Sequence, residues 1–128
     1  MNLKRVLALA GATAVTGALF LTGTASADTP GSKNLLPGEQ YCVAQQGAYQ
    51  VRGDGTATRD GAKFKIKKSG TSWVVIGSPG LVWNFQGEGR SPNSNFYGPG
   101  FYELCATNNG TRSTFVTLRI RTDTELPN

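Results

Sequence analysis

Histidine is absent from this sequence. Its absence excludes the Ser-His-Asp triad, the Cys-His nucleophile pair and every metal site that needs an imidazole ligand. Cysteine is scarce, because Cys42 and Cys105 are the two in the chain. Without a histidine partner, neither thiol is expected to act as a nucleophile or a metal ligand. An even pair in an exported chain is most simply a disulfide.

Helical periodicity is missing too, since no stretch sustains it over three turns. Turn signals instead recur roughly every 8–12 residues, which is typical of a sandwich or a barrel. We therefore expect an all-β protein, a small single-domain antiparallel β-sandwich or barrel with one disulfide.

The first residues have the features of an export signal. Lys4 and Arg5 precede an apolar run from Val6 to about Leu21, and Ala25-Ser26-Ala27 supplies the small residues that a signal peptidase reads. This predicts a secretory signal peptide over residues 1–27, cleaved after Ala27. The alternative, a membrane anchor, fits less well with the many Gly, Ala and Thr residues of the run, a composition that resembles signals of high-GC Gram-positive bacteria. We expect a secreted, extracellular chain with no stable membrane insertion after cleavage.

The mature chain, residues 28–128, is expected to be one β domain. Residues 28–34, with Pro30 and Gly31, read as a loose N-terminal arm, and residues 123–128 as a polar tail. Cleavage removes two basic residues and no acidic one, so the mature net charge falls from +5 to +3. This mildly basic balance does not indicate nucleic acid as a partner.

A β-hairpin is predicted from Gly100 to Thr122. Asn-Gly between two β-rich runs is the strongest short-range hairpin signal, and Asn109-Gly110 lies between Phe101–Thr107 and Thr114–Thr122. The return strand alternates, with the apolar residues Val116, Leu118 and Ile120 on one face. Farther upstream, four consecutive apolar residues from Trp73 to Ile76 predict a central strand covered on both faces. The segment 53–61 reads as a loop bracketed by Gly53–Thr56 and Asp60-Gly61, and the segment 87–100 reads as the longest irregular stretch.

A second alternating strand, Ala62–Lys68, places Phe64 and Ile66 inward and Lys63, Lys65 and Lys67 outward. These ammonium groups, together with that of Lys68, are candidate binding groups for an anionic cell-envelope polymer or an acidic protein surface. Arg90 is a further candidate binding residue, in the segment 87–99. The alternative is that these lysines protect an exposed sheet edge from unwanted pairing.

Two further functions remain open at this point. The exposed segment 87–99, with Arg90 near its front, is a candidate reactive loop of a secreted protease inhibitor, although no cysteine flanks it to stiffen it. A small hydrolase would need a pair of carboxylates, and the candidates are Asp54, Asp60, Glu88 and Glu103. A flat aromatic face that stacks on sugar is the functional alternative to core packing for the aromatic-rich half of the chain, which comprises Trp73, Trp83, Phe85, Phe96, Tyr97, Phe101 and Tyr102. We expect a non-catalytic binding module with no cofactor and no metal.

The orientation of the disulfide follows from the two-residue period of a strand. Tyr102 and Leu104 share the apolar face of their strand, so Cys105 and Glu103 point the other way. In the first strand, Tyr41 and Val43 share the apolar face, so Cys42 again points to the other face of its strand. We therefore predict a bridge on the outer face that either joins neighbouring strands or clamps the first strand to the hairpin at a sheet edge, with Cα atoms about 5–6 Å apart.

Two cysteines with a tryptophan between them and a terminal hairpin resemble the immunoglobulin-type sandwich. That fold places tyrosine two residues before the second cysteine, where this chain has Glu103, and its tryptophan shortly after the first, whereas Trp73 lies 31 residues on. The general prediction of a β-sandwich is kept and no family is assigned.

Overall fold

The fold is that of a computed structural model, which describes residues 28–123. This part of the chain is all-β and contains no helix long and apolar enough to cross a membrane. The predicted signal peptide, residues 1–27, lies outside the described residues, as do residues 124–128 of the predicted polar tail. The strands are β2 (Asp28–Leu35), β3 (Gln40–Gly47), β4 (Gln50–Ala57), β5 (Lys63–Lys68), β6 (Val74–Gly77), β7 (Asn84–Arg90), β8 (Gly100–Thr107) and β9 (Thr114–Thr122).

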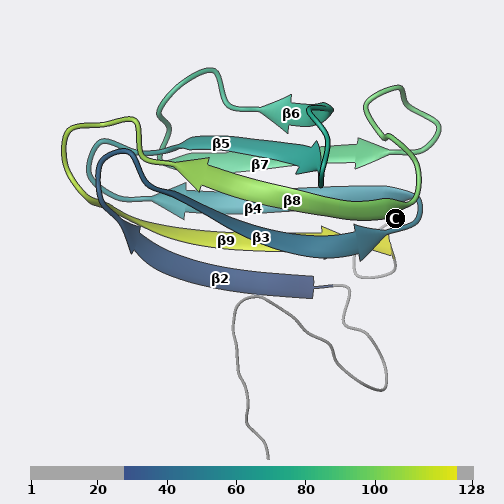
Figure 1. Ribbon diagram of the computed structural model, residues 1–128, viewed down its shortest axis with the longest axis horizontal. Coiled ribbons are helices and arrows are strands. Elements are labelled where there is room, and N and C mark those ends of the chain that lie inside the picture. Colours follow the sequence, from purple (N-terminus) through teal and green to yellow (C-terminus); the bar gives the residue numbers. More distant parts are fainter. Residues whose placement is uncertain (1–27, 124–128) are drawn as a thin grey trace, which may run out of the picture.

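Two antiparallel sheets pack face to face, which confirms the sandwich (Figure 1). One sheet has the order β2-β9-β4-β7 and the other β3-β8-β5-β6. The core comes from the alternating apolar residues of both sheets, as expected. Phe64 and Ile66 on β5 are fully buried, as are Tyr102 and Leu104 on β8, and Val116, Leu118 and Ile120 on β9 are almost completely so.

The predicted hairpin is wrong, because its two strands belong to different sheets. β8 pairs with β3 and β5, whereas β9 pairs with β2 and β4. The Asn108 side chain holds the crossover between them. It is buried, and its Nδ2 donates to the carbonyls of Leu35 (2.9 Å) and Arg112 (2.8 Å) while its Oδ1 accepts from the Gly110 amide. These bonds fix a sheet-to-sheet corner that the local turn signal alone does not distinguish from a hairpin.

The glycines of β4 and β7 were expected in loops but lie on the inner face of a sheet. A Cβ placed on Gly53 would lie 2.8 Å from Ile66 Cδ1, and one on Gly87 would lie 2.5 Å from Ile76 Cγ2. The missing side chains therefore let residues of the facing sheet approach the backbone closely. Glycine here serves sheet packing and not a turn.

The segment 28–34, expected as a loose arm, is the edge strand β2. It pairs with β9 along its whole length, from Asp28 opposite Arg121 to Leu35 opposite Thr114. Arg119 also donates from Nε to the Asp28 carboxylate at 2.9 Å, and this bond lowers the pKa of that carboxyl group. Pairing with the long amphipathic strand β9 thus outweighs the turn propensity of Pro30 and Gly31. Proline is tolerated in β2 because this strand lies at the edge of its sheet.

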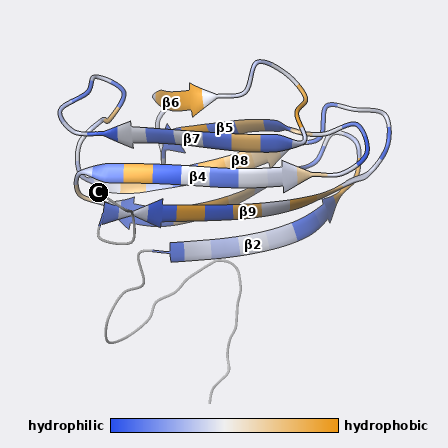
Figure 2. Ribbon diagram, turned by 180° about the vertical axis from the view of Figure 1, so that it is seen from behind, coloured by the Kyte–Doolittle hydropathy of each residue, from blue (hydrophilic) through white to orange (hydrophobic). Residues whose placement is uncertain are grey.

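The predicted central strand Trp73–Ile76 is also wrong, since β6 is short and lies at the edge of its sheet. Val75 is its buried apolar residue, whereas Trp73 is 53% exposed and Val74 40% exposed. Figure 2 shows β6 as an apolar strip along this edge. A short apolar run does not by itself reveal how many of its faces are covered.

Candidate functional site

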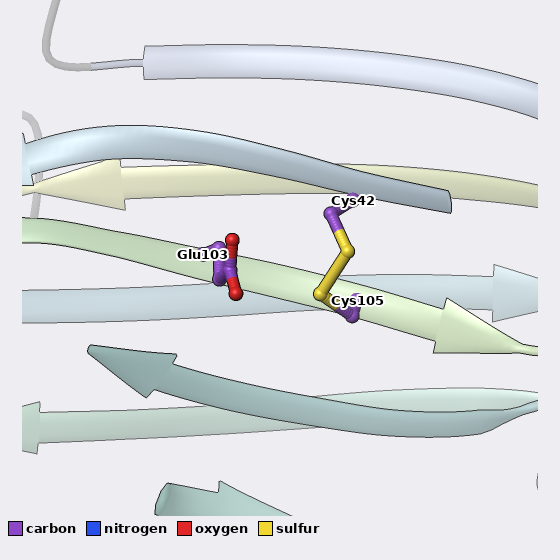
Figure 3. Close-up of side chains that lie close together, drawn as sticks. All are labelled: Cys42, Glu103 and Cys105. Carbon is purple, nitrogen blue, oxygen red and sulfur yellow. A yellow bond between two sulfur atoms is a disulfide. The ribbon is translucent and has the colours of Figure 1, made fainter. Parts of the chain in front are cut away.

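The disulfide joins Cys42 on β3 to Cys105 on β8, directly opposite one another in the sheet (Figure 3). It lies on the outer face, as predicted, although its Cα atoms are 4.0 Å apart and thus closer than expected. The Cα atoms of narrow, non-hydrogen-bonded pairs in an antiparallel sheet lie about 4.5 Å apart, which is nearer to the observed distance than about 5–6 Å is. Glu103 lies beside the bridge, with a carboxylate oxygen and both sulfurs within 4.8 Å of one another. Because the sulfurs are bonded to each other, the three groups do not form a set of metal ligands.

The lysine strand is not an edge strand, because β5 lies between β8 and β6. The edge-protection interpretation is therefore wrong. Lys63 donates to the carbonyl of Ser78, and Lys68 Nζ donates to the carbonyl of Tyr97 at 2.7 Å. Lys63 and Lys68 are thus both engaged inside the domain.

Lys67 is held by two acceptors. Its Nζ lies 3.2 Å from Glu103 Oε2 and 3.1 Å from the carbonyl of Thr71. Lys65 is the exception, since its ammonium group has no hydrogen bond or ion pair with any residue between 28 and 123. A single unengaged ammonium group on this face is a weak attractant for a polyanion.

Among the candidate carboxylates, Asp54 and Glu88 lie on the same outer face of adjacent strands, and the Arg52 guanidinium contacts both, at 3.1 and 3.8 Å. Glu88 faces outward from β7 and Glu103 faces outward from β8, so they lie on opposite sides of the sandwich. Asp54 accepts hydrogen bonds from Arg52 and Arg121, both at 3.1 Å. Such pairing is a structural use of these acids.

The fourth candidate, Asp60, is bound by Arg112. The guanidinium donates to Asp60 Oδ1 at 2.7 Å, and this hydrogen bond lowers the pKa of the carboxyl group. An acid held ionised in this way is a poor proton donor at neutral pH.

The predicted loop is shorter than expected, because β7 extends to Arg90 and leaves residues 91–99 as the connection to β8. Arg90 and residues 91–94 are exposed. The Ser91 amide donates to the carbonyl of Tyr49 at 2.8 Å, and the Asn93 amide donates to the carbonyl of Arg90 at 2.8 Å. Asn95 Nδ2 donates to the carbonyl of Glu88 at 3.1 Å.

The far side of this loop is fixed by Tyr102, a buried residue of β8. Its hydroxyl accepts from the Tyr97 amide at 2.9 Å and donates to the Gly98 carbonyl at 2.7 Å. The Phe96 ring stacks on the Tyr102 ring with centroids 5.1 Å apart. Burial raises the pKa of the Tyr102 hydroxyl, which keeps this hydrogen-bond donor neutral. The loop is therefore fixed at both ends without a disulfide.

The exposed residues at this end of the sandwich form what we call the loop end: Tyr49, Arg90 and residues 91–94. Tyr49 is 43% exposed and precedes Gln50, which lies opposite Arg90 in the sheet. The Arg90 guanidinium has no hydrogen bond or ion pair within residues 28–123. Arg90 was predicted as a binding residue, whereas Tyr49 was not among the candidates. A chain reversal next to Gly47 was the available signal.

The sequence matches no known protein family, and no curated protein is significantly similar to it.

Proposed function

We propose that this chain is a secreted, non-catalytic binding domain that contacts a protein partner through the loop end. The observation that carries the proposal is the contrast within the segment 90–99. Its base is held by hydrogen bonds to Tyr49, Glu88 and Tyr102, while its tip is exposed. A loop that is ordered before binding loses little conformational entropy when it binds, and this favours affinity.

The composition of the loop end supports a protein partner. Tyrosine and arginine are enriched among the residues that contribute most to protein interfaces. Arg90 carries an unengaged planar guanidinium, which suits a carboxylate on the partner. An anionic envelope polymer is the alternative, and it has less support, because Lys63, Lys67 and Lys68 are engaged inside the domain.

Affinity capture tests this proposal. The immobilised mature domain, residues 28–128, is incubated with medium from the culture that produces it. We expect a protein to be retained by the unchanged domain and by Lys65→Ala, which removes an unengaged cation from a different face. The same protein should be lost with Arg90→Ala and with Tyr49→Ala. Equal retention by all four proteins would refute the loop end as the contact surface.

Protease inhibition is a second candidate, favoured by the fixed and exposed position of Arg90. The Arg90 carbonyl accepts from the Asn93 amide at 2.8 Å, so the Arg90–Ser91 bond lies in a turn and not in an extended, substrate-like segment. Inhibition would therefore act by obstruction of the active site. Titration of a protease with specificity for basic residues tests it. A one-to-one loss of activity that Arg90→Ala abolishes would support inhibition, and unchanged activity would exclude it for that protease.

Secretion is part of the same proposal. A disulfide is compatible with an extracellular location, since such bonds persist in oxidising compartments. The intact mass of the exported protein tests the expected cleavage after Ala27. A mass that begins at Asp28 supports export by signal cleavage, whereas a mass that includes residues 1–27 contradicts it.

A further inference from the structure

Short polar side chains line up across the outer face of the β2-β9-β4-β7 sheet, the face seen from the front in Figure 2. Ser32 lies opposite Thr117, Thr117 opposite Thr56, and Thr56 opposite Asn84. All four side chains are exposed, and the hydroxyls of Thr56 and Thr117 are hydrogen-bonded to each other. Each strand contributes one residue, so the row runs perpendicular to the strands over a distance of about 14 Å.

Larger side chains flank this row and make it the floor of a groove. A second row is displaced from the first by two residues along each strand. It consists of Arg119, Asp54 and Gln86, which again lie opposite one another. On the other side is Phe115 of β9, which is 45% exposed. Two depressions of about 330 and 420 Å³ adjoin here, and Thr117 lines both. We call these two adjoining depressions, which together extend from edge strand β2 to edge strand β7, the cross-sheet groove.

The charges beside the cross-sheet groove are compensated within the protein. Asp54 accepts from Arg52 and Arg121, and Arg119 donates to the carboxylate of Asp28. The groups that remain are neutral. The Asn84 and Gln86 amides and the Ser32 hydroxyl form no hydrogen bond with any residue of the described range 28–123. Amides and hydroxyls offer both donors and acceptors.

We propose that the cross-sheet groove binds a neutral, extended oligosaccharide. Sugar hydroxyls both donate and accept hydrogen bonds, which matches the neutral groups of the groove. The exposed Phe115 ring can pack against the apolar face of a sugar ring. Because the groove reaches both edges of the sheet, it fits the interior of a chain better than a single terminal unit. The compensated charges disfavour an anionic ligand, which would have to compete with ion pairs already formed.

Binding of soluble, neutral hexasaccharides to the mature domain tests this site. The probes are cello-, xylo-, manno- and chito-oligosaccharides, and the readouts are calorimetric affinity and amide chemical-shift mapping by NMR. We expect at least one probe to bind and to shift the amides of Thr56, Asn84 and Thr117. The double variant Asn84→Ala/Gln86→Ala should weaken that binding about tenfold, as expected from the loss of two neutral hydrogen bonds.

The matched control is the double variant Gln46→Ala/Asn109→Ala, which removes one exposed amide of each kind outside the groove. It should leave the affinity unchanged, and thermal unfolding of both variants verifies that they are folded. The proposal is overturned if none of the probes binds, if the shifts map to Trp73 or the loop end, or if both double variants bind equally. Preferential binding of an acidic polysaccharide, weakened by salt, would also overturn it. The loop-end proposal does not depend on these outcomes.

Discussion

The backbone of Gly55 on β4 lies against the ring of Phe64, which belongs to β5 in the opposite sheet. A Cβ at Gly55 would lie 2.5 Å from Phe64 Cε1 and 2.8 Å from Cδ1. Phe64 is fully buried and also stacks on Phe85, with ring centroids 5.5 Å apart. The ring therefore has no free space to move into, and the closeness of the two sheets at this point depends on the missing side chain.

Gly55→Ala should destabilise the fold. The added methyl group would force the Phe64 ring or the β4 backbone to move, at a cost of about 1–3 kcal/mol of unfolding free energy. Gly80→Ala is the matched control, because a Cβ there meets nothing within 4 Å. Urea denaturation measures both variants. Equal stability of the two would contradict the close packing described for β4.

Tyr102→Phe should loosen the 91–99 loop while the core remains packed. The change removes the hydroxyl that bonds the Tyr97 amide and the Gly98 carbonyl, and it should cost about 1–3 kcal/mol. Faster hydrogen exchange of the Tyr97 amide, without faster exchange in β9, is the expected signature. Tyr49→Phe, which removes an exposed hydroxyl, should leave the unfolding free energy and the exchange rate of the Tyr97 amide unaltered. Unchanged exchange at Tyr97 would argue against Tyr102 as the anchor.

Alkaline pH should have the same local effect. Burial raises the pKa of Tyr102 above the ordinary value of 10.0, so the neutral hydroxyl stabilises the fold fully below that value. This contribution is lost as the pH rises through the folded-state pKa, because the unfolded chain releases the proton more readily. Unfolding free energy should therefore fall above about pH 10 in the unchanged protein. The fall should be smaller in Tyr102→Phe, and an identical pH profile would contradict this origin.

Removal of the disulfide should weaken the domain. The bridge spans 63 residues of sequence, and its loss should cost about 2–4 kcal/mol in the chain-entropy account. The double variant Cys42→Ser/Cys105→Ser keeps the neighbouring backbone pairing of β3 and β8, so it should still fold. Chemical denaturation in the absence of reductant measures the difference. A variant as stable as the parent would show that strand pairing alone holds β3 in place.

Much of the fold follows from the two-residue period of the strands. That period correctly predicts the inward faces of β5, β8 and β9 and the outer-face position of the Cys42–Cys105 bridge. The connection between strands was harder to predict. Asn109-Gly110 has the residues of a hairpin turn, but the bonds of Asn108 to Leu35 and Arg112 direct the chain to the other sheet. Leu35 is distant in sequence, so no local pattern contains this information.

The candidate site was predictable only in part, for the same reason. Lys63, Lys65 and Lys67 do alternate outward, but the carbonyl of Ser78 and the carboxylate of Glu103 that engage two of them come from other elements. Arg90 was selected correctly as exposed. The rigidity of its loop depends on the Tyr102 hydroxyl, and the cross-sheet groove depends on the register of four strands. Neither is visible before the chain is folded.

The most direct test of the loop-end proposal is the affinity of the captured partner for three forms of the domain. The account predicts that Arg90→Ala and Tyr102→Phe both weaken binding about tenfold or more, equivalent to about 1.4 kcal/mol. The first removes a contact, and the second removes the order of the loop that presents it. If a partner binds all three forms with the same dissociation constant, or if no partner is retained at all, the loop end is not a binding surface.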